Sequence, residues 1–224
     1  MKKLTLIAIA SIAVFLIGTV LAKGERKTCL SEKIHYSERK AETELQFGDL
    51  VFQSSKSGQS AAIQLATGSK YSHVGMIYEK KGDEWLVLEA VQPVKLTPLS
   101  EWVTHGDDNL YSVKRLKTAD SSLTSEVELQ MKTEAVTNIG KNYDIYFDWS
   151  DKEIYCSELV WKLYHSALNV ELGELRPLSD FDLTHPIVKE IMTRRYGKDI
   201  PLESLMISPG DMFNSDLLET IKPL

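Results

Sequence analysis

Two strand-like runs joined by a short polar loop constrain the fold of this chain most strongly. The runs span residues 71–78 and 84–91, and the loop between them includes Gly82. A three-residue hairpin loop usually places its last residue in the left-handed region of backbone space, where glycine costs least. With Gly82 in that position, Glu79 pairs with Asp83, and the sequence predicts an antiparallel hairpin.

This register makes two polar residues of the hairpin neighbours. Counting outward from Glu79 and Asp83 places His73 directly opposite Glu89 on one face of the sheet, with Cβ atoms roughly 4.5 to 5.5 Å apart. A carboxylate at that distance can hold an imidazole in one tautomer and stabilise its charged form. The prediction depends on the loop length, because a slip of one residue would place the two side chains on opposite faces.

Cys156 lies at the start of a segment that has the period of an amphipathic helix. A thiol at a helix N-terminus feels the positive end of the backbone dipole, which favours its thiolate form. Cys156, His73 and Glu89 are the residue types of a nucleophile, its base and the carboxylate that orients the base. We therefore predict a thiol nucleophile at the base of a cleft. The apolar stripe expected to form core on this helix comprises Leu159, Val160, Leu163, Tyr164 and Ala167.

The rest of the chain is expected to mix short strands and helices. Periodicity and turn residues predict a strand within 45–52, a helix over 59–67 that ends at Gly68, a helical turn over 98–104, a strand over 110–116, helices over 125–139 and 181–196, and a mixed segment over 201–218.

The N-terminus has the pattern of a secretion signal. A short basic start precedes an uncharged apolar run over residues 4–21, and small residues follow. Export is therefore expected, to the periplasm or the outside of the cell. An uncleaved membrane anchor is the alternative, because the run is nearly the about 20 residues that a span needs. We expect residues 1–22 to be the signal peptide, 23–44 a linker and 45–224 the catalytic domain.

The charge of the chain argues against nucleic acid as a partner. The formal net charge is −6, and it becomes −8 without residues 1–22, which contain two lysines and no acidic residue. Phosphate binding needs clustered Lys and Arg. No metal or other cofactor is expected either, because the remaining histidines lack the close spacing of a ligand set: His35, His105, His165 and His185.

Cys156 itself and the nearby Glu158 also have possible structural roles. In an oxidising compartment Cys156 would be able to form a structural disulfide with Cys29. A free thiol is favoured, because Cys29 lies in the polar segment just after the expected cleavage site. Glu158 is expected to form a salt bridge rather than to take part in catalysis.

Several short motifs resemble those of NlpC-type papain-like cell-wall hydrolases. In those enzymes the cysteine usually precedes the histidine, whereas His73 comes first here. The reversed order resembles the circularly permuted branch, the YiiX/YebB-like papain-like amidases, from about Phe47 to Pro209. The motifs are Gly48-Asp49-Leu50-Val51-Phe52, Tyr71-Ser72-His73-Val74-Gly75-Met76, Gly140-Lys141-Asn142-Tyr143-Asp144 and Tyr155-Cys156-Ser157-Glu158-Leu159-Val160.

The resemblance implies an α+β fold with a small antiparallel sheet packed against helices. It implies Cys156 as nucleophile, His73 as general base and then acid, and Glu89 as the group that orients His73. Tyr143 takes the place of a tyrosine that lies near the oxyanion in such enzymes, although Asn142 replaces the proline that often precedes it. Tyr155 is a further candidate for binding the oxyanion or the substrate.

These observations predict an exported cysteine amidase or peptidase that works through an acyl-enzyme. A peptide or small amide is the expected substrate, and the peptide stems of peptidoglycan are the exported substrate class. A thioesterase or lipid acyltransferase of the same fold is an alternative, for which a long apolar groove would speak, whereas a peptide needs charged anchors. A non-catalytic protein that binds an amino acid or peptide is the third possibility.

Overall fold

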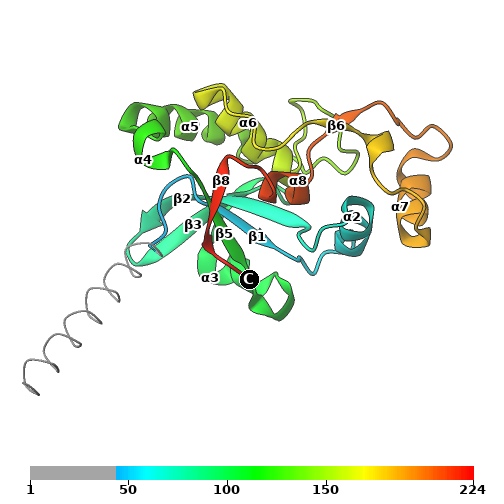
Figure 1. Cartoon of the computed structure of the whole chain (residues 1–224), viewed down its shortest axis with the longest axis horizontal. Coiled ribbons are helices and arrows are strands. Elements are labelled where there is room, and N and C mark those ends of the chain that lie inside the picture. Colours follow the sequence, from blue (N-terminus) through cyan, green and yellow to red (C-terminus); the bar gives the residue numbers. More distant parts are fainter. Residues whose placement is uncertain (1–43) are drawn as a thin grey trace, which may run out of the picture. The chain divides into compact units, whose positions relative to one another are not determined.

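A six-stranded antiparallel sheet forms the centre of the computed structural model, which describes residues 44–224 (Figure 1). The strand order is β4-β3-β2-β1-β5-β8. The strands are β1 (Leu50–Gln53), β2 (His73–Lys81), β3 (Glu84–Glu89), β4 (Lys95–Pro98), β5 (Ser112–Leu116) and β8 (Leu218–Lys222). A second, two-stranded sheet pairs β6 (Arg176–Pro177) with β7 (Leu205–Met206).

Helices connect the strands and follow them in the sequence. The α-helices are α2 (Ser60–Thr67), α3 (Leu99–Thr104), α4 (Ala119–Ser122), α5 (Ser125–Asn138), α6 (Cys156–Leu168), α7 (Pro186–Tyr196) and α8 (Pro209–Phe213). Two short 3-10 helices are η1 (Asp107–Asn109) and η2 (Leu178–Asp180).

The sheet buries both of its faces. In β1, Leu50 and Phe52 belong to the larger core, which also contains Tyr164 of α6, whereas Val51 packs in a smaller core with Trp102 of α3. This alternation follows from the two-residue period of a strand. Helix α6 therefore lies over one face of the sheet and α3 over the other (Figure 1), and the predicted sheet packed against helices is confirmed.

Most predicted helices are present, and the C-terminal region differs from prediction. Helix α2 ends at Gly68, which is left-handed with φ 64° as its sequence indicates. The helix predicted over 181–196 begins later, because Pro186 occupies its first turn and the His185 side chain caps it by accepting a hydrogen bond from the Ile187 N–H. Strand β8 was not predicted, and it adds an edge to the sheet beside β5.

The predicted hairpin register was wrong. The loop is shorter than expected, because Lys81 already pairs with Glu84, although Gly82 is left-handed with φ 63° as predicted. Glu79 therefore pairs with Leu86 instead of Asp83, a shift of three residues. A shift by an odd number would have moved the side chains to the opposite face.

A β-bulge between Ile77 and Glu79 returns the side chains of the hairpin to the predicted face of the sheet. One extra residue of β2 is accommodated there, so that Met76 pairs with Leu88, two residues from the predicted partner. His73 and Glu89 are consequently not directly opposite each other but are displaced along the hairpin on the same face. Their side chains still meet, because a diagonal neighbour lies within reach of long side chains.

Several predictions fall on residues 1–43 and lie outside the part of the chain that the structure describes. They are the signal peptide or anchor, the linker up to residue 43, and the possible disulfide through Cys29. Within residues 44–224, no helix is both long and apolar enough to cross a membrane.

Candidate active site

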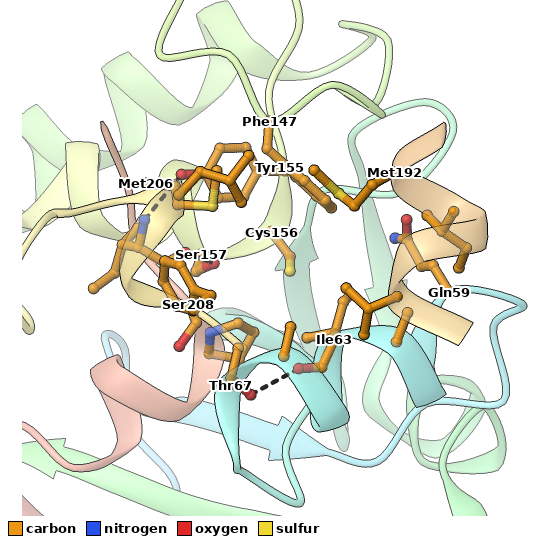
Figure 2. A pocket seen from close by; sticks show the side chains of 18 of the residues that line it. Gln59, Ile63, Thr67, Phe147, Tyr155, Cys156, Ser157, Met192, Met206 and Ser208 are labelled. Carbon is orange, nitrogen blue, oxygen red and sulfur yellow. Dashed lines mark hydrogen bonds between the residues drawn. The ribbon is translucent and has the colours of Figure 1, made fainter. Parts of the chain in front are cut away.

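Cys156 is the first residue of α6, and its sulfur points into a pocket (Figure 2). The side chain is buried, and Cys156 is a free cysteine. Tyr155 precedes it in an extended conformation as the helix cap, and its backbone N–H donates to the Glu158 carboxylate at 3.3 Å. This capping contact fixes where the helix begins and therefore where the thiol lies.

The imidazole of His73 lies between a thiol and a carboxylate. Its Nε2 is 2.7 Å from Oε2 of Glu89, so the other ring nitrogen, Nδ1, is the one that faces Cys156, with which the ring interacts. The second Glu89 oxygen accepts a hydrogen bond of 2.5 Å from the hydroxyl of Thr97 on β4. Trp102 stacks against the ring at a centroid distance of 6.0 Å. The imidazole is thus held in one orientation.

The charges of these groups support one another. Burial favours a neutral imidazole, but hydrogen bonds and charge interactions with Cys156 and Glu89 outweigh it and raise the pKa of His73 to about 10. Burial also opposes ionisation of the thiol, yet His73 and the backbone N–H groups of Val74 and Ser157 lower the pKa of Cys156. For Glu89, the same histidine overcomes burial and lowers the pKa. A thiolate paired with an imidazolium is the favoured state.

A chain of hydrogen bonds reaches Tyr143 from the other side. Arg195 donates to Oε1 of Gln59 at 2.5 Å, and Nε2 of Gln59 donates to the Tyr143 hydroxyl oxygen at 2.9 Å. Because arginine can only donate, it fixes which end of the amide is the acceptor. The hydroxyl of Tyr143 accepts from Gln59, so its own hydrogen is free to be donated towards Cys156, with which it interacts.

Tyr143 keeps its proton at ordinary pH. Burial, together with the nearby charge of Cys156, raises its pKa well above the usual value of 10.0. A protonated hydroxyl next to the nucleophile is a hydrogen-bond donor where an oxyanion would develop.

Tyr155 is the second tyrosine that the sequence predicted for the site, and its hydroxyl is bound by Ile207. That oxygen accepts a hydrogen bond of 3.1 Å from the backbone N–H of Ile207, and the ring packs edge-on against Phe147 at 5.2 Å. Burial raises the pKa of Tyr155 well above its usual range. The structure therefore brings Tyr155 to the wall of the Cys156 pocket, with its hydroxyl engaged by the C-terminal segment.

Two hollows meet at the site. One is mainly apolar, has Cys156 in its wall and lies among α2, α6 and α7. The other has His73 and Glu89 in its wall, and most of the residues that line it are polar, although most of its surface is apolar. Gln59 and Tyr143 line both. The thiol thus opens onto an almost wholly apolar hollow, and the imidazole onto one with more polar side chains in its wall.

Four residues of the site had escaped the sequence analysis. They are Gln59, Thr97 and Arg195, described above, and Gln53, which pairs with His73 across β1 and β2. Gln53 is completely buried, and among residues 44–224 neither atom of its amide has a hydrogen-bond partner. The only sequence signal for Gln53 was its position at the end of the apolar run Leu50-Val51-Phe52. Gln59, Thr97 and Arg195 carry no such signal in the sequence.

The remaining polar residues near the nucleophile are accounted for. Glu158 is fully buried and forms the predicted salt bridge, with Oε1 2.8 Å from Nζ of Lys162. Within residues 44–224, no group of three or more His, Cys, Asp or Glu side chains is arranged to hold a metal ion.

Comparisons with known proteins agree with this geometry. Residues 44–222 match the family described as permuted papain-like amidase enzyme, YaeF/YiiX, C92 family. YiiX of Escherichia coli (strain K12), an uncharacterized protein, is 44% identical over 176 residues, which are 79% of this chain and 85% of that protein.

A solved structure extends the likeness to three dimensions. The crystal structure of a protein described as metalloprotein yiiX, from Escherichia coli O157:H7, is 45% identical and superposes with a TM-score of 0.73, covering 78% of this chain and 95% of the other. The order in which His73 precedes Cys156, the antiparallel sheet and the family match lead to the same conclusion: this chain belongs to the YaeF/YiiX family of permuted papain-like amidases.

Proposed function

We propose that this protein is an exported cysteine hydrolase that cleaves amide bonds through an acyl-enzyme on Cys156. The observation that carries the proposal is the buried free thiol beside an imidazole, which Glu89 and Thr97 hold in place. A thiolate nucleophile, an acid and base, and a group that orients the base are the parts that acyl transfer needs.

In the first step, the Cys156 thiolate attacks the amide carbonyl carbon and forms a C–S bond. The His73 imidazolium then gives its proton to the amide nitrogen, the C–N bond breaks and the amine leaves. Glu89 stays ionised throughout and keeps the ring aligned. An acyl-enzyme remains on Cys156.

In the second step, a water molecule attacks the acyl carbon. The neutral imidazole of His73 takes one proton from the water, a C–O bond forms and the C–S bond breaks. The carboxylic acid is released and the thiolate–imidazolium pair is regenerated. One water is consumed in each cycle, and no redox change occurs.

Both steps pass through a tetrahedral intermediate with a negatively charged oxygen. The backbone N–H of Cys156, at the start of α6, and the hydroxyl of Tyr143 are its donors. Gln59 and Arg195 act as positioning residues, because they direct the Tyr143 hydrogen away from themselves. Tyr155 contributes a wall of the pocket rather than a donor.

The related crystal structure is described as a metalloprotein, so a metal in this chain has to be weighed. A protein site for a catalytic zinc ordinarily supplies three ligands. Near the nucleophile, Cys156 and His73 are two such groups, and the described residues contain no set of three. Glu89 is turned away from the thiol and bound by His73 and Thr97. The donor set does not fit a metal, and the mechanism uses none.

Peptidoglycan stem peptides are the substrate class that export suggests, and a digestion tests it. Purified peptidoglycan is incubated with the wild type and with Cys156→Ala, and the fragments are compared by mass spectrometry. New amine and carboxylate ends should appear only with the wild type. Identical profiles would remove the cell wall as substrate.

A non-catalytic binding protein is the rival function, and a trapping experiment separates it. Brief incubation with an activated acyl ester should increase the mass of the Cys156 peptide by one acyl group, and the adduct should disappear as carboxylate is released. A hydrolase loses the adduct, and His73→Ala retains it for longer. Acylation of the wild type no faster than of a small free thiol would favour the binder.

A further inference from the structure

We infer that the substrate joins an apolar acyl chain to a polar amine, and that the apolar hollow beside Cys156 holds the acyl chain. This inference rests on the proposed acyl transfer at Cys156 and names its substrate class. It follows from what lines each hollow and from which hollow contains the nucleophile.

The acyl pocket lies beside Cys156, between α2 and α7 (Figure 2). Its volume is about 90 Å³, several times what one water molecule needs. The side chains that form its walls away from the thiol are mostly aliphatic or aromatic, among them Ile63, Ala66, Phe181, Leu183, Ile191 and Met192.

The serine and threonine hydroxyls that line this pocket are already used by the protein. Hydrogen bonds run from Thr67 to the Ile63 carbonyl at 2.8 Å, from Ser157 to the Ile207 carbonyl at 2.8 Å, and from Ser208 to the Asp211 carboxylate at 2.6 Å. A peptide backbone placed here would leave its own N–H and C=O groups without these partners, which costs free energy. A hydrocarbon chain has no such groups to satisfy.

The reaction itself decides which part of the substrate enters which hollow. The thiolate bonds to the acyl carbon, so the acyl part lies on the side of Cys156, which lines the acyl pocket. The leaving amine takes a proton from His73, so the amine lies on the side of the second hollow, which His73 lines. The reverse placement would put the general acid on the wrong side of the scissile bond.

The hollow beside His73 offers polar side chains to the amine part of the substrate. Its lining includes Ser55, Ser57, Gln92 and Thr104, with the cation of Lys56 at the exposed edge. An amine that carries a carboxylate, such as an amino acid, matches this lining in polarity and charge. The inferred class is therefore an N-acyl amino acid or a peptide whose amine carries a fatty acyl chain.

A series of acyl chains tests the inference. Acetyl-, butyryl-, octanoyl- and dodecanoylglycine are compared for calorimetric binding to Cys156→Ala and for release of glycine by the wild type. Each added CH₂ that is buried should tighten binding about four-fold until the pocket is full. Equal binding and turnover of acetyl- and octanoylglycine would overturn the inference.

Filling the pocket provides a second test with a matched control. Ala66 lines the acyl pocket on α2, whereas Ala61 on the same helix is exposed and does not line it. Ala66→Phe should lose octanoylglycine turnover by at least about ten-fold, as expected for the exclusion of a few CH₂ groups, and lower that of acetylglycine much less. Ala61→Phe should change neither, and equal losses of the two substrates in Ala66→Phe would contradict the pocket.

If Ala66→Phe does not fold, Ile63→Thr serves instead, because it places a hydroxyl in the pocket and makes the side chain smaller rather than larger. It should weaken octanoylglycine binding more than acetylglycine binding, and an equal effect on both would count against the inference. Turnover of acetylglycine at least as fast as octanoylglycine refutes the acyl pocket and leaves the hydrolase standing. Tight binding of octanoylglycine with no turnover of any amide refutes the hydrolase and leaves the pocket supported.

Discussion

His73 is contacted on several sides by groups that each have a separate task. Glu89 fixes one ring nitrogen, Cys156 interacts with the ring, and Trp102 covers a ring face. Because the thiol and the imidazole stabilise each other's charged forms, neither titrates as it would alone. The reactivity of the sulfur therefore depends on the histidine.

The pH dependence of alkylation measures this coupling. In a Cys29→Ser background, iodoacetamide should label Cys156 below about pH 7, where an ordinary thiol with pKa about 8.5 is mostly protonated. His73→Ala should move the midpoint upward, because burial then raises the pKa of Cys156 and only the backbone N–H groups of Val74 and Ser157 oppose it. The rate is followed by the mass of the Cys156 peptide. An unchanged profile in His73→Ala would show that the two groups are not coupled.

The hydrogen-bond chain to Tyr143 makes a near-isosteric test possible. Gln59→Glu keeps an acceptor for Arg195 but offers Tyr143 a carboxylate, so the hydroxyl turns its hydrogen towards residue 59. We expect kcat to fall about ten-fold or more, with little change in KM, because one oxyanion donor is lost. The kcat of Tyr143→Phe should fall at least as far.

The melting temperature separates this effect from damage to the fold. It should stay within a few degrees of the wild type in Gln59→Glu. A kcat that survives Gln59→Glu but not Tyr143→Phe would mean that Gln59 does not position the hydroxyl.

That Cys156, His73 and Glu89 come together was predictable from sequence, and the contacts that support them were not. Cys156 begins a helix pattern and His73 and Glu89 share a hairpin, so local periodicity indicates them. Thr97 and Arg195 act through contacts that join separate elements, and Arg195 reaches Gln59 across 136 residues of sequence. No local pattern encodes such a contact.

At the scale of elements, the β2–β3 hairpin depends on an irregularity. Without the bulge beyond Ile77, the odd register at the loop would place Glu89 on the face away from His73. Turn chemistry predicted Gly82 correctly, but no residue type marks a bulge in a strand of mostly buried residues. The predicted pairing of His73 with Glu89 was thus reached through a register that was itself wrong.

Gly75 leaves room for the side chain of Val87 on the neighbouring strand. A Cβ at this position would lie 2.4 Å from a methyl of Val87 and 3.5 Å from Nε1 of Trp102. Gly75→Ala should therefore lower the free energy of unfolding by about 1–3 kcal/mol, as overpacking does. Urea denaturation measures the change. Gly75→Ala combined with Val87→Ala should recover part of the loss, and a loss that stays the same would place the strain elsewhere.

Helix α6 carries a buried acid whose titration should be visible in stability. Burial, only partly offset by Lys162, raises the pKa of Glu158 from 4.5 to about 7. The folded state then binds a proton that the unfolded state has released between about pH 4.5 and 7, so this group's contribution to stability falls as pH rises through that window.

Glu158→Gln should remove that slope from the pH dependence of the unfolding free energy. Thermal denaturation at several pH values compares the variant with the wild type, and Glu190→Gln, which is exposed on α7, is the control. A wild type whose stability rises between pH 4.5 and 7, with the same slope in Glu158→Gln, would contradict the assignment.

At the scale of the whole molecule, the C-terminal segment contacts the site although it is far from Cys156 in the sequence. Ile207 accepts a hydrogen bond from Ser157 and donates one to Tyr155, so that it binds the residues on both sides of Cys156. Sequence analysis described this region as mixed and assigned it no role in the site. Its contribution is made through main-chain groups, which every residue type carries, and so leaves no signature in the sequence.

Two truncations separate this contribution from that of the edge strand. Ending the chain after Ser204 removes Ile207, and Cys156 should then lose its labelling by iodoacetamide at low pH. Ending it after Ser215 removes only the end of the chain with β8, and labelling should persist although thermal stability falls. Persistent labelling after the first truncation would show that the thiol is positioned without Ile207.

The bonds from Ile207 to both neighbours of Cys156 also bear on when the protein acquires a reactive thiol during its synthesis. Fifty residues separate Ser157 from Ile207, and the ribosome makes the chain from its N-terminus. While those last residues are still being added, the growing polypeptide has its sulfur but lacks the main-chain anchor on either side of it. The main-chain bonds on both sides of the sulfur therefore form only after Ile207 has been synthesised, fifty residues later than Ser157.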